Sequence, residues 1–374
     1  MNILMHCVYF PPEVGGLESH VFHLCVALAG KGHTVGVVTS RSRPGLPGHE
    51  VMDGVDVWRT WLPARNPAGW LTHAAGSIPR LVAQARSADI LHAQAFQSVF
   101  PALLARRRSG APVVTTWHTS HFLKRADHRL WRPVFRRLLE NADYNLAASA
   151  EIAEVGESIA PGCRVEALTN GVDTELFRPV APLLPVTGRR RLVVPRRLFE
   201  KNGVEYFVRA LPRIADAVDV EAVVVGDGPE RSRLERLARD LEVRDRITFL
   251  GARPHAEMPG ILASAELAIF PSLMEATSVA ALECMACEVP VAASRVGGLP
   301  EIVDDDVGGL FRPADPEDLA DTVIRLLKTD DLPARGSRAR ARVVDRWSND
   351  RLAERHLEVY RTLLDRRGAG GGAA

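Results

Sequence analysis

Short apolar runs alternate along the first half of the chain with longer stretches whose apolar residues recur at helical spacing. Asn2–Val8 has the composition of a buried strand, and in Leu17–Ala29 the apolar residues fall on one face of a helix. This rhythm of strand and helix predicts a parallel sheet that is covered by helices. The further strands expected in this half are Thr34–Thr39, Asp89–His92, Val113–Trp117 and Tyr144–Ala147.

A turn-rich stretch at 178–185, which we expect to be a linker between two domains, interrupts this rhythm, which then starts again. The elements expected after it are the strands Arg191–Val194, Glu221–Val225, Arg246–Leu250, Ala265–Phe270 and Pro290–Ala293, and the helices Val204–Ala217 and Arg231–Leu241. We therefore predict an α/β protein with two facing Rossmann-like, doubly wound domains, at 1–180 and 186–348. A helical run at 350–366 is expected to cross back to the first domain, and the tail 367–374 to be disordered.

Composition limits the classes of function that the chain can have. Its 374 residues suffice for two domains, and a net charge of +1 argues against electrostatic capture of nucleic acid. The five cysteines are odd in number and show no disulfide framework, which fits a cytoplasmic protein. The first residues begin a strand, so we expect no signal peptide, and no run has the length of a membrane span.

The most informative residues are two carboxylates, Glu275 and Glu283, which lie eight positions apart across a strand-to-helix junction. The helix begins near Val279, with Thr277 or Ser278 placed to cap it. A bare helix N-terminus favours phosphate, because its N–H groups and partial positive charge point outward. Two carboxylates beside a diphosphate would suit hydroxyl-rich groups on either side of it, such as a ribose and a sugar.

Basic residues follow the first strand of the second half. Arg196, Arg197 and Lys201 come shortly after Arg191–Val194, where a guanidinium and an ammonium group can clamp a diphosphate. The alternative is a solvated basic loop. The acid Glu200 in the same loop would have to point away from a phosphate group.

Three other strand ends carry candidate groups. Gly15 and Gly16 can bring backbone amides close to a ligand or can form a tight turn. His118 can hydrogen-bond a substrate hydroxyl or can be a satisfied structural residue. Gly226 belongs to a tight turn that can still approach a nucleotide.

A basic amphipathic stretch covers 121–139, where arginine and lysine alternate with aromatic and aliphatic residues. It can lie on an anionic membrane surface or pack on its own domain with a solvated basic face.

Together these motifs resemble the retaining glycosyltransferases of the GT-B fold, in the large family 4, and the resemblance spans nearly the whole chain. The E-x7-E element at Glu275 and Glu283 carries most of it. The other matching motifs are Asn170-Gly171-Val172-Asp173 with Phe177, Gly226-Asp227-Gly228-Pro229 and Gly297-Gly298-Leu299-Pro300-Glu301.

The resemblance implies a role for each candidate residue. Glu283 would hold the ribose hydroxyls and Glu275 the hydroxyls of the donor sugar. Arg197 and Lys201 would clamp the diphosphate, although the family often has one more residue in this spacing, so Arg196 is the alternative. His118 would contact the sugar near the reacting carbon. The other donor-binding residues implied are Gly16, Gly226, Ser278 and Val279.

We therefore expect a hexosyltransferase that uses a UDP- or GDP-sugar, retains configuration and needs no metal or other cofactor. The acceptor stays open, and so does the donor sugar, because Ala276-Thr277-Ser278 departs from the common pattern. Peripheral membrane contact through 121–139 is possible, and no nucleic acid partner is expected. The alternatives are a nucleotide-sugar epimerase and a non-catalytic sugar-nucleotide-binding protein on the same fold.

Overall fold

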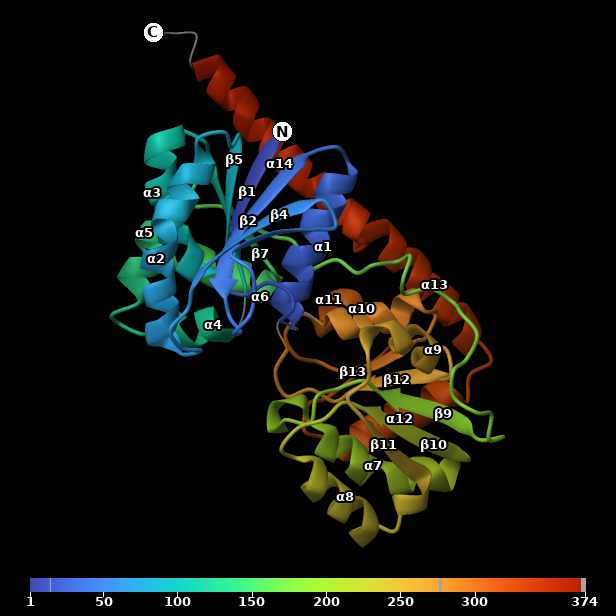
Figure 1. Cartoon of the computed structure of the whole chain (residues 1–374). Helices are drawn as coiled ribbons and strands as arrows, with labels where there is room; N and C mark the ends of the chain where they lie inside the picture. The colour runs from blue at the N-terminus through green and yellow to red at the C-terminus, as the bar shows by residue number, and fades with distance from the viewer. Residues whose placement is uncertain (14, 119, 276–277, 371–374) are drawn as a thin grey trace. The chain divides into compact units, whose positions relative to one another are not determined.

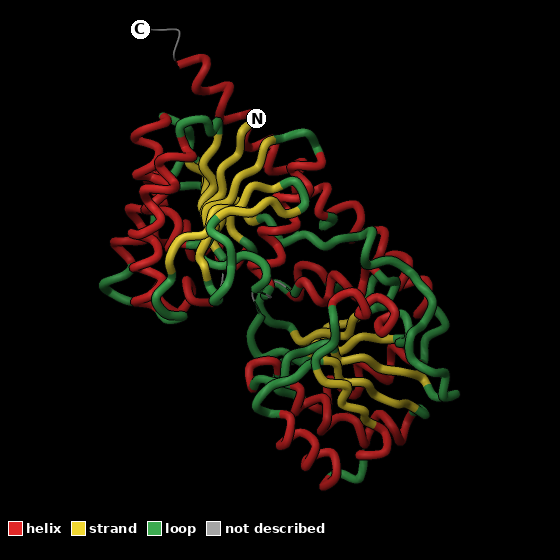
Figure 2. Tube along the Cα trace, in the orientation of Figure 1, coloured by secondary structure: helices red, strands yellow, loops and turns green. Residues whose placement is uncertain are grey.

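A computed structural model describes residues 1–13, 15–118, 120–275 and 278–370 of the chain. The chain divides into two compact units. The first unit contains Met1–Asn170 and Asn349–Ala374, and the second contains Gly171–Ser348. Within each unit the strands lie in the middle and helices cover them (Figures 1 and 2).

The first unit is built on an eight-stranded sheet with the order β3-β4-β2-β1-β5-β6-β7-β8. Every described pair is parallel except β3 with β4, which is antiparallel. The strands are β1 (Asn2–His6), β2 (Thr34–Arg41), β3 (His49–Met52), β4 (Val55–Trp61), β5 (Ile90–Gln94), β6 (Val113–Trp117), β7 (Tyr144–Ala147) and β8 (Val165–Ala167).

Helices cover both faces of this sheet, and Figure 1 shows α2, α3 and α5 on one face and α1 with α14 on the other. The helices of the unit are α1 (Gly16–Gly30), α2 (Pro67–Ala85), α3 (Phe96–Ser109), α4 (Ser120–Ala126), α5 (Arg132–Asn141), α6 (Ala150–Ile159) and α14 (Asn349–Gly370). Leu24 and Leu28 of α1 share one buried cluster with Leu357 and Tyr360 of α14. The last helix of the chain is therefore an integral layer of the first unit.

The second unit is built on a six-stranded sheet with the order β11-β10-β9-β12-β13-β14, whose described pairs are all parallel. The strands are β9 (Arg190–Val194), β10 (Val220–Val225), β11 (Ile247–Gly251), β12 (Leu267–Phe270), β13 (Val291–Ser294) and β14 (Gly308–Phe311). The helices are α7 (Val204–Ala217), α8 (Arg231–Asp240), α9 (Met258–Leu262), α10 (Val279–Ala286), α11 (Leu299–Ile302), α12 (Pro316–Leu327) and α13 (Leu332–Arg346).

The strands of the second unit are apolar at nearly every position because both faces are covered. In β9, Leu192 and Val194 join the cluster that holds α7 and α12, whereas Val193 joins the cluster that holds α10 and α13. Successive side chains of a strand point to opposite faces, so a strand that is buried on both sides reads as one continuous apolar run. This is why the sequence pattern located β9 to β13, five of the six strands.

Four strands, β3, β4, β8 and β14, were not predicted. β3 is the antiparallel edge strand and its side chains are exposed or half-buried, so it lacks an apolar run. β4 alternates buried and half-buried residues along most of its length, so it has a period of two in place of a continuous apolar run. β8 has only three residues, and β14 begins with two glycines, so neither has a run of apolar side chains.

The boundary between the units lies at Asn170, before the predicted boundary at 180. Phe177 is buried in a cluster of the second unit, and the backbone N–H of Val172 donates to the carbonyl of Trp347. The turn-rich stretch is likewise tied to this unit, since the N–H of Leu183 donates to the carbonyl of Gly260. It is therefore part of the second unit and not a free linker.

Two further expectations need correction or refinement. The predicted disordered tail began at 367, but α14 continues to Gly370, and residues 371–374 lie outside the described residues. The basic stretch 121–139 forms parts of two short helices, α4 and α5, whose aromatic residues Phe122 and Phe135 are fully buried with Trp117. Its apolar side chains thus mostly pack within the first unit, and Leu130 and Val134 are its exposed large ones. None of the helices in the described ranges is both long and apolar enough to cross a membrane.

Candidate functional site

Most candidate site residues of the second unit lie on loops at the carboxyl ends of β9, β10, β12 and β13, and glycines let these loops approach one another closely. A Cβ atom on Gly226 would overlap the carbonyl oxygen of Arg196, and one on Gly297 would overlap that of Glu275. Both glycines have positive φ angles, of 145° and 49°, which other residues rarely adopt. The glycines found by motif matching are thus the points at which these loops touch.

Arg196 and Glu275 form an ion pair that joins the loop after β9 to the loop after β12. Both side chains are largely buried, and the Arg196 guanidinium also donates to Oδ1 of Asn202 at 3.0 Å. Nε of Arg196 is buried and has no hydrogen-bond partner among the described residues. Arg197 behaves differently: it is exposed, and its guanidinium lies 5.8 Å from the ring centroid of Phe199. The structure therefore brings Arg196, and not Arg197, to Glu275.

The loop after β12 and the N-terminus of α10 that follows it each carry a hydroxyl group for which the described residues offer no partner. Ser278 is at the N-cap position, but its side chain makes no capping hydrogen bond, contrary to the prediction, and the alternative cap Thr277 lies outside the described residues. The hydroxyls of Ser278 and of Ser272, in the loop after β12, are buried without a partner in the described part of the chain. A buried polar group without a partner is costly, so these hydroxyls and Nε of Arg196 favour a polar ligand here.

Val279 begins α10 and Glu283 lies one turn further along. The Glu283 side chain is only 14% exposed, and its Oε1 lies 2.9 Å from Nε2 of His255. His255 belongs to a short 3-10 turn, His255–Glu257, that follows β11. The hydrogen bond that His255 donates to the Glu283 carboxylate raises the pKa of His255 above its usual value, against the effect of partial burial.

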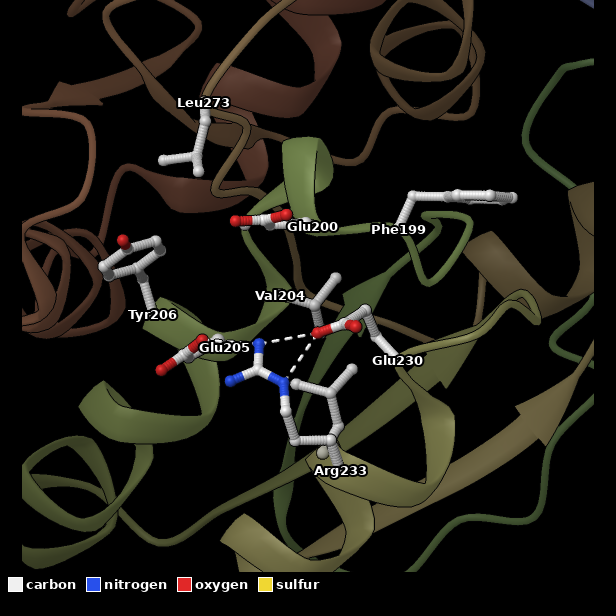
Figure 3. Close-up of a pocket in the computed structure, with 10 residues that line it drawn as sticks. Phe199, Glu200, Val204, Glu205, Tyr206, Glu230, Arg233 and Leu273 are labelled. Carbon is white, nitrogen blue, oxygen red and sulfur yellow. Dashed lines mark hydrogen bonds and ion pairs between the residues drawn. The ribbon is translucent and has the colours of Figure 1, made fainter.

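Lys201 is exposed, and its backbone carbonyl accepts hydrogen bonds from the N–H groups of Leu273 and Met274, at 2.9 and 3.3 Å. The loop after β9 is thereby fixed to the loop after β12. The acid of this loop, Glu200, lines a separate pocket with Tyr206 and Leu273, as Figure 3 shows. Glu200 therefore lines this pocket, and the carboxylate that pairs with Arg196 is that of Glu275.

In the first unit, His118 follows β6 directly and is almost fully buried. Its Nε2 lies 2.8 Å from Oε1 of Gln94, and since a carbonyl oxygen only accepts, Nε2 must carry the hydrogen. Burial, with a contribution from His356, lowers the pKa of His118 to about 3. His118 is therefore a neutral imidazole with a fixed tautomer.

A chain of polar contacts continues from Gln94 into the core of the first unit. Nε2 of Gln94 lies 3.4 Å from Nε2 of His92, which also contacts the Thr116 hydroxyl at 2.7 Å, and Nδ1 of His92 contacts the Tyr360 hydroxyl at 2.6 Å. The network thus runs from α14 to the candidate residue His118.

The loop that follows β1 leads into α1. Gly15 is at the N-cap position of this helix, and Gly16 is the first residue of the helix. His20, one turn later in α1, lies with its ring centroid 5.1 Å from that of His118. Both ring nitrogens of His20 are buried, with no hydrogen-bond partner within the described ranges. The structure therefore adds a second histidine beside His118.

Sequence reasoning missed four residues that contact the candidate site: His20, Gln94, Asn202 and His255. His255 and Asn202 come from short turns in which no periodic pattern marks a residue. Gln94 ends β5, two positions beyond the predicted end of this strand at His92, and a polar residue at the carboxyl end of a buried strand is the signal that would have found it.

Two family models together match most of the chain. The model described as Glycosyltransferase Family 4 matches residues 14–176, and the model described as Glycosyl transferases group 1 matches residues 189–329. One subunit of phosphatidylinositol N-acetylglucosaminyltransferase, from Arabidopsis thaliana, is 30% identical over 330 residues, which cover 85% of this chain and 72% of that protein.

Solved structures resemble the whole chain. Sucrose-phosphate synthase from Thermosynechococcus elongatus superimposes with a TM-score of 0.83 at 25% identity, over 97% of this chain and 99% of that one. HepE from Anabaena, in complex with UDP and glucose, gives a TM-score of 0.77 at 20% identity, over 97% and 100% of the two chains. The fold is that of the GT-B glycosyltransferases.

Proposed function

The chain belongs to glycosyltransferase family 4, and from this premise we propose that it transfers a sugar from a nucleoside diphosphate sugar to an acceptor hydroxyl, retains the anomeric configuration and uses no metal ion. The observation that carries the proposal is the Arg196–Glu275 ion pair beside the N-terminus of α10, where the hydroxyls of Ser272 and Ser278 are buried without described partners. A cation, a carboxylate and buried hydroxyls, one at a helix N-terminus and one in the loop before it, match a diphosphate that is joined to a sugar.

Charge that develops on the departing diphosphate is the main obstacle to this reaction. Arg196, Lys201 and the N–H groups at the start of α10 would stabilise that charge, which a metal ion does in other transferases. We assign the clamp to Arg196 in preference to Arg197, because Arg196 reaches Glu275 whereas Arg197 lies over Phe199. Gly226 holds the loop of Arg196 in place by close backbone contact.

The sugar and the ribose would each be bound by one carboxylate. Glu275 would accept from hydroxyls of the donor sugar and Glu283 from those of the ribose, and Val279 would offer a backbone N–H at the start of α10. In the first unit, His118 would contact the sugar near its reacting carbon and Gly16 would offer a backbone N–H. The acceptor hydroxyl would attack the face from which the diphosphate departs, with a phosphate oxygen as the base.

A thermal-shift screen tests the donor directly, because a ligand that binds only the folded state raises Tm by mass action. UDP is the first probe, since HepE was crystallised with it, followed by GDP and ADP and then by their sugar derivatives. We expect one nucleotide series to raise Tm equally with and without a chelator such as EDTA. An absence of any shift across all three series would contradict the proposal, and conversion of a donor into its epimer without acceptor would identify an epimerase instead.

A further inference from the structure

His255 is placed where it can control a carboxylate of the donor site. Its Nε2 lies 2.9 Å from Oε1 of Glu283, and the structure describes no partner for the second oxygen of that carboxylate. A glutamate side chain has three rotatable bonds, so a hydrogen bond to one oxygen restricts where the other can point. His255 thus fixes one oxygen of Glu283 and leaves the other available.

The residues that support the His255 ring come from a distant part of the sequence. The ring of Phe177, which is fully buried, meets the ring of His255 edge-on with centroids 4.9 Å apart. Asp173 forms the turn that leads to Phe177, because its Oδ1 accepts from the backbone N–H groups of Glu175 and Leu176, at 3.0 and 2.9 Å. The segment 171–177, at the start of the second unit, therefore supports the imidazole that binds Glu283.

We propose that His255 is a positioning residue that orients Glu283 toward the ribose hydroxyls of the bound nucleotide, and that Asp173 and Phe177 hold His255 in place for this task. The inference rests on the proposed function, since it takes Glu283 as the ribose-binding group. It also gives Asp173 and Phe177, which the sequence motif marked without a role, a physical purpose at the site.

The charged groups around His255 favour its protonated form. Glu283 on α10 and Asp173 on the segment before Phe177 both raise the pKa of His255. Glu257 of the same turn pairs at 3.9 Å with Arg253, which lies just before the turn, and Arg340 of α13 donates to the carbonyl oxygens of Phe177 and Ala286. The positive charge of the imidazolium therefore faces two carboxylates while the nearby arginines have other partners, and the bond to Glu283 weakens when His255 loses its proton.

Nucleotide binding measured by calorimetry tests this assignment. We compare UDP with 2′,3′-dideoxy-UDP on the full chain, for wild type, His255→Ala and His255→Gln, at pH 6 and pH 8.5, and replace UDP by GDP or ADP if one of these is the nucleotide that wild type binds. His255→Ala should weaken UDP about tenfold at pH 6, as expected for the loss of a hydrogen bond to a charged group. His255→Gln keeps a donor without a titrating charge, so it should bind UDP within a few-fold of wild type and show no change between the two pH values.

The dideoxy nucleotide separates an orienting role from a structural one. Wild type should lose affinity when the ribose hydroxyls are absent, and His255→Ala should lose much less, because its Glu283 is no longer held toward them. An equal loss in both proteins, or an unchanged Kd in His255→Ala, would overturn the assignment of His255. A wild type that binds none of the three nucleotides would overturn the proposed function itself.

A second imidazole–carboxylate pair provides the matched control. His49 and Asp56 lie at the edge of the first unit with Nε2 and Oδ1 3.0 Å apart, and the His49 side chain is as exposed as that of His255. His49→Ala should leave the Kd for UDP, its pH dependence and the dideoxy effect unchanged. If His49→Ala reproduced the effects of His255→Ala, the changes would reflect the loss of any surface ion pair.

Discussion

The two units have the same layered architecture but treat polar groups in opposite ways. Eleven of the twelve histidines lie in the first unit, and six of those in the described ranges are buried: His6, His20, His73, His92, His118 and His356. Burial lowers the pKa of each of the six. The second unit has only His255, which is half exposed and whose pKa is raised by Glu283.

This difference shows two ways of preparing polar groups for a ligand. The first unit fixes neutral imidazoles inside its core through a chain of hydrogen bonds that ends on His118. The second unit keeps an almost entirely apolar core and holds its charged groups at the strand ends, by close glycine contacts and ion pairs such as Arg196–Glu275. The stability of the first unit therefore depends on pH, because its buried histidines must stay neutral. The arrangement of the second unit depends instead on the pairing of its charged side chains.

The largest expected effect is a selective loss of stability in the first unit at mildly acidic pH. Each buried histidine has a folded-state pKa below the unfolded value near 6.5, so only the unfolded state takes up its proton in this range. The stabilisation is complete above pH 6.5 and is lost as pH falls toward the folded values, which are about 3 for His6 and His118 and about 4 for His356. Each histidine then removes about 1.4 kcal/mol per pH unit below 6.5, and six together remove several kcal/mol at pH 5.5.

Hydrogen exchange read by mass spectrometry can measure the two units in the same sample. Between pH 7.5 and 5.5, after correction for intrinsic exchange rates, peptides from β5 and β6 should lose protection. Peptides from β9 and β12 should not, since the raised pKa of His255 contributes stability at low pH that is lost as pH rises. The control is urea at pH 7.5. If the first unit were simply weaker, it would open first there too, and equal loss of protection in both units would refute the comparison.

The charged site of the second unit gives the next largest effect. Arg196→Ala should lower the free energy of transition-state stabilisation by about 2–4 kcal/mol, by analogy with the removal of one oxyanion donor. Arg197→Ala is the matched control, one position along the same loop, and should cost far less because its side chain lies over Phe199. Steady-state kinetics with the donor found by thermal shift measure both. If Arg197→Ala lost more kcat/KM than Arg196→Ala, Arg197 and not Arg196 would be the residue that clamps the diphosphate.

The fold was predictable wherever burial left a repeated mark in the sequence. The strands β6 and β7 and the helix α7 coincide with their predicted ranges, since continuous apolar runs and a clear helical face define them. β3 was not predicted because it is an exposed edge strand without an apolar run, and β8 was not predicted because it has only three residues. Elements that depend on a neighbour for their burial cannot be read from their own residues alone.

The candidate site was predictable in its residue types but not in its pairing. Glu275, Glu283 and the arginines were found because their motifs follow strands that were themselves clear. No local pattern indicates that Arg196 rather than Arg197 reaches Glu275, since this depends on loop positions that the close approach of Gly226 to Arg196 and of Gly297 to Glu275 helps to set. His255 could not be foreseen for the same reason, because its partners Phe177 and Glu283 are far from it in sequence.

The smallest expected effect concerns the hydrogen-bond chain of the first unit. Gln94→Leu removes the acceptor for Nε2–H of His118, and a buried donor that loses its partner costs about 1–3 kcal/mol of stability. If the chain orients His118, sugar transfer should also slow by about tenfold, since each 1.4 kcal/mol of lost alignment corresponds to a factor of ten. Thermal unfolding and the rate of transfer at saturating donor measure the two consequences separately.

Thr116→Val provides the comparison that decides whether this effect is specific. It removes a buried contact of similar length, 2.7 Å from His92, at a point of the chain that does not touch His118. Its stability should fall by a similar amount while the rate of transfer stays near that of wild type. If both variants slowed transfer equally, general loosening of the first unit would explain the loss, and the role of Gln94 in fixing the His118 tautomer would be refuted. If only Gln94→Leu slows transfer, the buried polar chain of the first unit serves its candidate site as directly as ion pairing serves that of the second.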